Sequence, residues 1–260
     1  MTAYLGAENL LESADTITVS NEATGFEGQN AYDRRTSTWW KPGVLSSPQT
    51  ESIIAEFSTA QTVDYFFVTG HNLFTEGATI TLSYSTASPQ VWTPLFTVTP
   101  TDDTCFYRRT GTPVSAADWK IEITNSTANT LLAIAAFGQD TPLPEGLKAP
   151  YMPPRYARDK TISNMVTEGG QFIGRSIWSD GYEVEIKQTL VVPGWVESNY
   201  DTLIDRLEVA PFPYVWDYQI DDSPSKDTSI YAWTESFTHA KYTHNGAIYM
   251  DFSLKGKGLV

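Results

Sequence analysis

The stretch Gly25–Gly43, GFEGQNAYDRRTSTWWKPG, and the three apolar runs that follow it decide the fold. The runs are ESIIAEFS at 51–58, TVDYFFVTGHNL at 62–73 and ATITLSYST at 78–86. In the last run, Ile80, Leu82 and Tyr84 alternate with hydroxyl-bearing residues, a period of two that places one face of a strand in a core and the other in water. A polar, aromatic-rich loop followed by strand after strand is typical of a β-scaffold that presents a binding surface.

The same alternation continues along the first half of the chain. Trp119, Ile121 and Ile123 repeat it, and Pro, Gly, Asn and Ser separate the runs at the spacing of short turns. The 13% of aromatic residues also favours half-buried strands over a helical bundle. Residues 15–138 therefore predict an antiparallel β-sandwich with almost no helix.

A proline-rich segment divides the chain. Residues 139–154 read QDTPLPEGLKAPYMPP and hold five prolines, so neither a helix nor a central strand is expected to run through them. We predict a sandwich domain over 1–140, a Pro-rich connecting arm over 141–155 and a second, β-rich domain over 156–260.

The second domain is expected to be α+β, or mostly β, with one helix. Thr161–Val166, Ser176–Trp178 and Tyr182–Val192 have the pattern of strands, with Gly169-Gly170 and Asp180-Gly181 as turns.

One helix and a terminal hairpin complete this domain. Apolar residues from Tyr200 to Leu207 follow the i, i+3, i+4, i+7 spacing, between Pro193-Gly194 and Pro211. At the end of the chain, Ser236–Thr243 and residues 248–254 alternate around Asn245-Gly246, the favoured two-residue hairpin turn.

Composition excludes several classes of protein. The formal charge of −14, from 31 acidic and 17 basic residues, disfavours nucleic acid as a partner, because phosphate binding relies on clustered Lys and Arg. A single cysteine, Cys105, cannot form an intrachain disulfide, which fits assembly in a reducing cytoplasm. We expect no export signal and no membrane insertion, because the N-terminus lacks an apolar signal core and no apolar run approaches about 18 residues.

Motifs for catalysis and cofactors are lacking. His239 and His244 are five residues apart on one expected strand, so their side chains face opposite ways and no zinc site is predicted. Neither a nucleophile elbow nor a phosphate-binding loop occurs. Asp102-Asp103 and Asp221-Asp222 are interpreted as turn residues, although carboxylates that meet only in space leave a glycan-processing enzyme open. The prediction is a protein that is not an enzyme, without metal or cofactor.

A loop surface for carbohydrate is the remaining candidate site. Sugars need polar partners for their hydroxyls and flat apolar faces for their C–H groups. Eight residues on two loops offer both, and they are the predicted ligand-binding set: Asp33, Arg34, Arg35, Trp39, Trp40, His71, Asn72 and Phe74. In the alternative interpretation, Trp39 and Trp40 plug the bottom of the sandwich and Asp33 caps a turn.

These residues resemble the discoidin, or coagulation-factor-type, galactose-binding-like domain. The family's opening loop of Ala, Asp, Thr and Trp is matched by Ala31, Asp33, Thr38 and Trp39, and its later strands by Ile80–Ser85 and Ala117–Ile123. The resemblance covers roughly residues 10–140 and implies a galactose-binding-like jelly roll. The family's terminal disulfide is absent, and its first-loop calcium site has no clear set of carboxylates here.

The second half, with PFPYVWDY, SIYAWTESFTHAKY and YMDFSLKGKG, is similar to bacteriophage tail-tip and baseplate proteins. This resemblance implies a virion structural protein at the distal tail, assembled in the host cytoplasm. Its partners would be other phage tail proteins, further copies of itself in a ring, and a host-surface glycan. The alternative is a free-standing or hydrolase-associated carbohydrate-binding protein.

Overall fold

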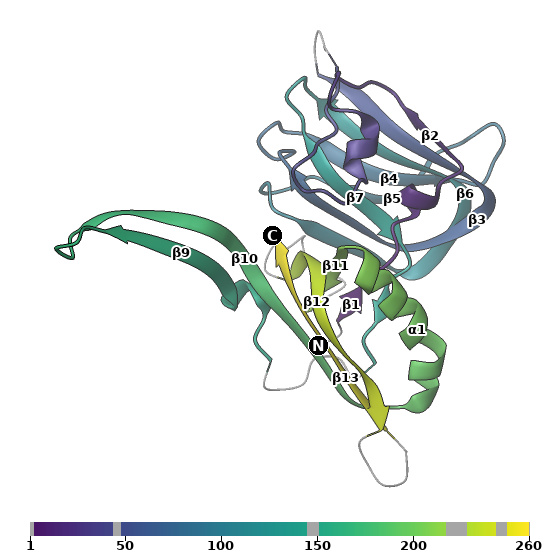
Figure 1. The fold of residues 1–260 in the computed structure, drawn as a ribbon. Helices are drawn as coiled ribbons and strands as arrows, with labels where there is room; N and C mark the ends of the chain where they lie inside the picture. Colours follow the sequence, from purple (N-terminus) through teal and green to yellow (C-terminus); the bar gives the residue numbers. More distant parts are fainter. Residues whose placement is uncertain (1–2, 44–47, 145–150, 217–227, 243–248, 260) are drawn as a thin grey trace.

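The computed structural model describes all residues except 1–2, 44–47, 145–150, 217–227, 243–248 and 260. The described residues form two antiparallel β-sheets and one α-helix (Figure 1). The prediction of a mainly β protein is therefore confirmed. The predicted Asn245-Gly246 turn and His244 lie outside the described residues. None of the described helices is long and apolar enough to cross a membrane.

The first sheet has the strand order β2-β3-β6-β4-β5, with β7 paired to β3. Its strands are β2 (Thr16–Val19), β3 (Gln49–His71), β4 (Thr79–Ser85), β5 (Thr93–Val98), β6 (Phe106–Ser126) and β7 (Leu132–Gly138). The described residues also contain three short 3-10 helices, at Leu10–Ser13, Gly28–Ala31 and Pro154–Tyr156.

This single sheet folds over itself to make a sandwich. The pairing of β3 with β6 shifts register between Glu56 and Gln61, where both long strands bend. The two halves then face each other across one core: Trp119 lies 5.7 Å from Phe137, ring centroid to ring centroid, and both side chains are fully buried. The predicted antiparallel sandwich is confirmed.

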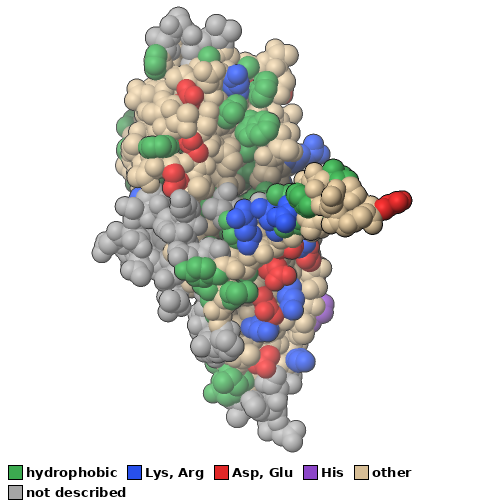
Figure 2. Space-filling model, turned by 90° about the vertical axis from the view of Figure 1, so that its left-hand side faces the viewer, with side chains coloured by type: hydrophobic (Ala, Val, Ile, Leu, Met, Phe, Trp, Pro, Cys, Tyr) green, Lys and Arg blue, Asp and Glu red, His purple; other side chains and the backbone are tan. Residues whose placement is uncertain are grey.

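The second sheet has the order β8-β1-β11-β12-β13-β10-β9. Its strands are β1 (Tyr4–Leu5), β8 (Thr141–Pro142), β9 (Arg158–Val166), β10 (Phe172–Val191), β11 (Phe212–Val215), β12 (Ser229–Tyr242) and β13 (Met250–Leu259). Ion pairs between neighbouring strands, such as Lys255 of β13 with Glu185 of β10 at 3.5 Å, lie on its outer face, and Figure 2 shows the mixed charges of that face.

The α-helix α1 (Pro193–Val209) covers the inner face of the second sheet. Proline stands in its first turn, where a missing N–H costs nothing. Leu203 and Leu207 pack with Val184 and other apolar residues of the sheet, and the hydroxyl of Tyr200 accepts a hydrogen bond from the backbone N–H of Ala240 at 3.1 Å. The predicted helix is confirmed.

The predicted Asp180-Gly181 turn is wrong, because β10 is one continuous strand through this point. Gly181 pairs with Asp159 of β9, and the next residue, Tyr182, pairs with both β9 and β13. Pairing of Asp180 and Gly181 with β9, and of the residues that follow with β13, overrides the turn preference of Asp-Gly. The chain turns instead at Gly169-Gly170, as predicted, where Gly170 has a φ of +79° that suits glycine.

The domain limits 1–140, 141–155 and 156–260 stay a prediction. β1 near the start of the first range pairs with β8, which immediately follows that range, and β1 also pairs with β11 of the second sheet. Both ends of the sandwich segment are therefore tied into the second sheet.

A shared apolar core also joins the sandwich to the second sheet. Phe67 of β3 stacks on Tyr231 of β12 with a centroid distance of 5.9 Å, and Cys105 donates to the carbonyl of Ser229 at 3.3 Å. Phe67, Cys105 and Tyr231 are all buried in one cluster. This junction is a packed core rather than a linker.

A buried charge cluster lies beside this junction. Arg109 donates from Nε to Asp140 at 2.8 Å, lies 3.8 Å from Asp64 and sits over the ring of Tyr4 at 4.4 Å. Tyr107 also donates to Asp140, at 2.6 Å, and the backbone N–H of Asp140 donates to Asp64 at 2.8 Å. Burial, followed by the charge of Asp140, raises the pKa of Asp64 to about 6, and burial also raises the pKa of Asp140.

Candidate functional site

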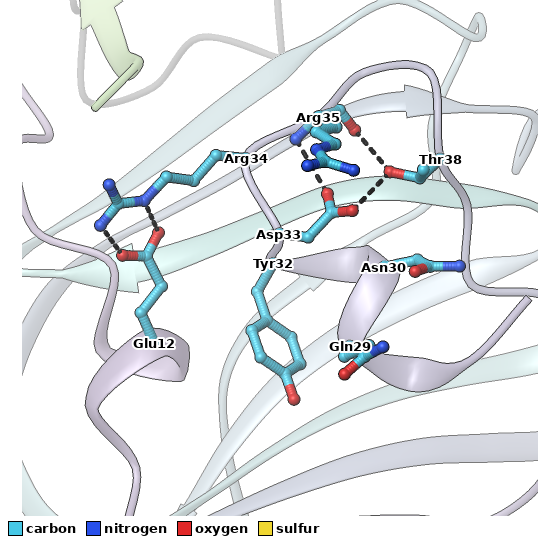
Figure 3. A pocket seen from close by; sticks show the side chains of 8 residues that line it. All are labelled: Glu12, Gln29, Asn30, Tyr32, Asp33, Arg34, Arg35 and Thr38. Carbon is cyan, nitrogen blue, oxygen red and sulfur yellow. Dashed lines mark hydrogen bonds and ion pairs between the residues drawn. The ribbon is translucent and has the colours of Figure 1, made fainter. Parts of the chain in front are cut away.

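An open pocket of about 620 Å³ lies on the sandwich where the Gly28–Ala31 helix meets the loop that follows it (Figure 3). Its walls are polar apart from one aromatic ring. It is lined by Glu12, Gln29, Asn30, Tyr32, Asp33, Arg34, Arg35 and Thr38. Three of the eight predicted ligand-binding residues, Asp33, Arg34 and Arg35, thus share one pocket.

Asp33 shapes the loop. One of its carboxylate oxygens accepts from the backbone N–H of Arg35 at 2.9 Å, and the other accepts from the hydroxyl of Thr38 at 2.7 Å. Between them, Arg34 has a φ of +68°, a left-handed conformation that is uncommon for a residue with a side chain. Asp33 therefore caps a turn, as the alternative interpretation stated. It also fixes the backbone from which the side chains of Arg34 and Arg35 extend.

Arg34 is held by Glu12, which comes from the Leu10–Ser13 helix. The Arg34 Nε donates to one Glu12 oxygen at 2.9 Å and an Nη donates to the other. This fork geometry uses both oxygens of the carboxylate, and it raises the pKa of the guanidinium. The ion pair closes one side of the pocket (Figure 3).

The two tryptophans pack inward. Trp40 is 1% exposed, its Nε1 donates to the Asn21 carbonyl at 3.1 Å, and its backbone pairs with Leu132. Trp39 is half-buried against the junction core, and its carbonyl accepts from the Asn30 amide at 3.0 Å. The Trp40 indole therefore stabilises the sandwich and does not face the pocket, because so large an apolar ring gains more from burial than from display.

Most predicted residues of the second loop are also buried or hydrogen-bonded within the fold. His71 is 6% exposed, its Nε2 lies 2.9 Å from the Thr104 carbonyl, and burial lowers its pKa. Asn72 uses both amide atoms, donating to the Asn129 carbonyl and accepting from the Leu131 N–H. Phe74, 53% exposed, is the one member of this loop that presents a large surface to solvent.

The two loops meet through the backbone of Leu132, which pairs with Trp40 on one side and His71 on the other. Their buried residues are thus neighbours, whereas the pocket walls contain no residue of the 71–74 loop.

Sequence reasoning did not select the other pocket residues. Gln29, Asn30 and Tyr32 stand immediately before Asp33 in the opening stretch, so proximity could have indicated them. Glu12 is brought in by the fold alone, since it lies 22 positions before Arg34.

Among the residues that the structure describes, no group of three or more His, Cys, Asp or Glu side chains could hold a metal ion. The pocket therefore offers hydrogen bonds and one ring rather than a metal centre.

Comparisons with known proteins show a likeness of fold over half of the chain. No family model matches, and no curated protein matches. Among solved structures, a GH29 fucosidase from Ruminococcus gnavus in complex with fucose is 16% identical over 52% of this chain and 27% of its own, with a TM-score of 0.42. The matched half of this chain thus spans about a quarter of the length of that fucosidase.

Two smaller proteins are matched over nearly their full length. Chitosan-binding module 1 of a chitosanase/glucanase from Paenibacillus sp. IK-5 is 21% identical over 51% of this chain and 99% of its own, with a TM-score of 0.40. A pectin binding carbohydrate binding module is 18% identical over 48% and 91%, with a TM-score of 0.38. At these identities the likeness concerns the fold, and it bears on neither a ligand nor a phage tail.

Proposed function

We propose that this chain is a non-enzymatic structural protein that assembles through its second sheet and presents the sandwich as a carbohydrate-binding module. The setting we propose is the distal tail or baseplate of a tailed bacteriophage. Its partners would be other tail proteins, further copies of this chain in a ring, and a host-surface glycan, with assembly in the host cytoplasm.

A projecting hairpin carries this proposal. Residues 161–177, the outer part of β9 and β10, extend beyond the rest of the second sheet (Figure 1). Ile162 pairs with Ile177, and Val166 pairs with Phe172. All four side chains are between 41% and 63% exposed.

These apolar pairs continue the inner face of the sheet. Arg158 is opposite Tyr182, and Tyr182 packs in the core under α1. By strand alternation, Ile162 and Val166 share that face, which α1 does not reach (Figure 1). The hydrogen-bonded pair Asn164 and Arg175 lies between them on the same face. An isolated two-stranded ribbon is marginally stable in water, and an uncovered apolar face marks an interaction site. The hairpin is therefore built to lie on another molecule, which we assign to the next copy in the assembly.

The test is the mass of the purified protein in solution, together with electron microscopy for rings. The chain should be oligomeric, and Val166→Ser with Phe172→Ser should shift it towards monomer without loss of folded structure. Phe74→Ser is the matched control, because Phe74 is as exposed but lies on the sandwich. A wild-type monomer at every concentration would reject assembly through the hairpin.

A second candidate is a free-standing or hydrolase-associated carbohydrate-binding protein. The observation that favours it is the open polar pocket with Tyr32 in its wall, since a sandwich with such a pocket needs no assembly to bind a sugar. This protein would be monomeric and would bind glycans on an array by itself. Release of reducing sugar from any glycan would argue against both candidates.

A further inference from the structure

The charged side chains of the pocket differ in how many hydrogen bonds they already make. Both Glu12 oxygens are taken by Arg34, and both Asp33 oxygens are taken by the loop itself. Thr38 is also engaged, with Asp33 and with the Arg35 carbonyl. Each oxygen of the two carboxylates therefore already accepts one hydrogen bond before a ligand arrives.

The groups that stay open to a ligand are mainly donors. The Arg35 guanidinium is exposed and makes no hydrogen bond or ion pair with the described residues. Its backbone is nevertheless fixed, because its N–H is bound by Asp33. The side chains of Gln29 and Tyr32 also make no hydrogen bond with the described residues, and both line the pocket (Figure 3).

We propose that this pocket prefers an acidic sugar, with the ligand carboxylate on Arg35 and the sugar ring beside Tyr32. This inference rests on the proposed carbohydrate-binding function and specifies its ligand class as a uronic acid or a similar carboxylated saccharide. A planar guanidinium can donate two parallel hydrogen bonds to a carboxylate. The Gln29 amide and the Tyr32 hydroxyl are of the kind that bind sugar hydroxyls.

Charge accounting favours this ligand over a neutral one. The pocket lining carries two acidic and two basic side chains, so its formal charges sum to zero. Glu12 and Arg34 bind each other and Asp33 accepts two hydrogen bonds from the loop, whereas the Arg35 guanidinium makes no hydrogen bond with the described residues. With a neutral sugar bound, the Arg35 guanidinium would stay hydrated and unpaired, whereas the carboxylate of an acidic sugar would form an ion pair with it. The chain as a whole carries −14, so the preference must come from this local contact and not from the overall field.

The preference can be measured by titrating the full chain with D-galacturonic acid and with D-galactose, which carry a carboxylate and a hydroxymethyl group, respectively, at the same position. We expect the acid to bind about ten-fold more tightly, the size of one charge-assisted contact. Arg35→Gln should abolish this difference, so that the variant binds the acid and galactose with equal affinity. Arg35→Lys should give an intermediate preference, because it keeps the charge but loses the fork.

Lys187→Gln is the matched control, because it removes one positive charge from an exposed position on the second sheet. Equal affinity for the two sugars, or an acid preference that survives Arg35→Gln, would overturn the inference while leaving carbohydrate binding in place. Binding of neither sugar, nor of oligosaccharides built from them, would reject the inference together with the carbohydrate-binding function.

Discussion

Replacing Asp64 by asparagine should stabilise the protein at neutral pH. Asp64 is 4% exposed and lies beside a second buried carboxylate, Asp140, at the junction of the sandwich and the second sheet. Burial and the charge of Asp140 outweigh the attraction of Arg109, so the pKa of Asp64 is about 6. In the unfolded chain an aspartate has a pKa of about 3.9.

The sign and size of the effect follow from these two values. Between about pH 4 and pH 6 the folded state binds the proton that the unfolded state has lost, so the free energy of unfolding falls as the pH rises through this window. Above pH 6 the free energy of unfolding remains lowered by the full amount. Two pH units correspond to about 3 kcal/mol, at about 1.4 kcal/mol for each, and Arg109 is already included in this balance.

An asparagine side chain at this position would keep an oxygen for the Asp140 N–H without the buried charge. Asp64→Asn should therefore raise the free energy of unfolding at pH 7.5 by about 1–3 kcal/mol and flatten its decline between pH 4 and pH 6. Urea unfolding across pH 4–8 measures both quantities. Asp201→Asn is the control, because it removes the same charge from an exposed position on α1. An Asp64→Asn variant that loses stability at pH 7.5, with an unchanged pH profile, would refute the reasoning.

Three further predictions concern the cores. Tyr231→Ala removes the ring that stacks on Phe67 across the junction; it should cost about 3–5 kcal/mol and split one calorimetric transition into two, whereas a single unshifted transition would contradict a shared core. Trp40→Ala should cost a similar amount and lower the Tm by several degrees, and an unchanged Tm would mean that Trp40 is not packed as described. Burial raises the pKa of the Cys105 thiol to about 12, so the native protein should not react with iodoacetamide at pH 8 although the urea-unfolded chain does; rapid native labelling, read by mass spectrometry, would count against this burial.

Local sequence patterns predicted helices and strands well where the local conformational preference and the long-range strand pairing or packing favour the same structure. The helix could be predicted from Tyr200–Leu207 because its apolar spacing and its flanking prolines indicate the same limits, and the structure places it at Pro193–Val209. The Asp180-Gly181 turn failed because pairing with strands on both sides outweighs the preference of two residues. That pairing joins residues far apart in sequence, which a local pattern does not contain.

The candidate site shows the same limit for side chains. Three residues of the opening stretch, Asp33, Arg34 and Arg35, line one pocket. The local pattern gave no measure of burial, so Trp40 and His71, which lie in the core, were selected together with exposed residues. The partner of Arg34 was also hidden, because Glu12 reaches the loop only after the first 3-10 helix has packed on the sandwich.

The rigid junction gives the two proposed activities a physical connection. An open pocket with one aromatic ring and a few polar groups is expected to bind a single sugar weakly, since much of the ligand stays in water. The junction core around Phe67 and Tyr231 would hold each pocket in a fixed orientation relative to the hairpin that binds the next copy. Copies joined in this way would present their pockets at set spacings, so a glycan surface would meet several at once and the effective affinity would rise by orders of magnitude.

On this argument, the Val166→Ser and Phe172→Ser variant should keep its affinity for a soluble monosaccharide and lose most of its retention on a glycan-coated surface. Equal retention of monomer and oligomer would show that assembly contributes nothing to binding.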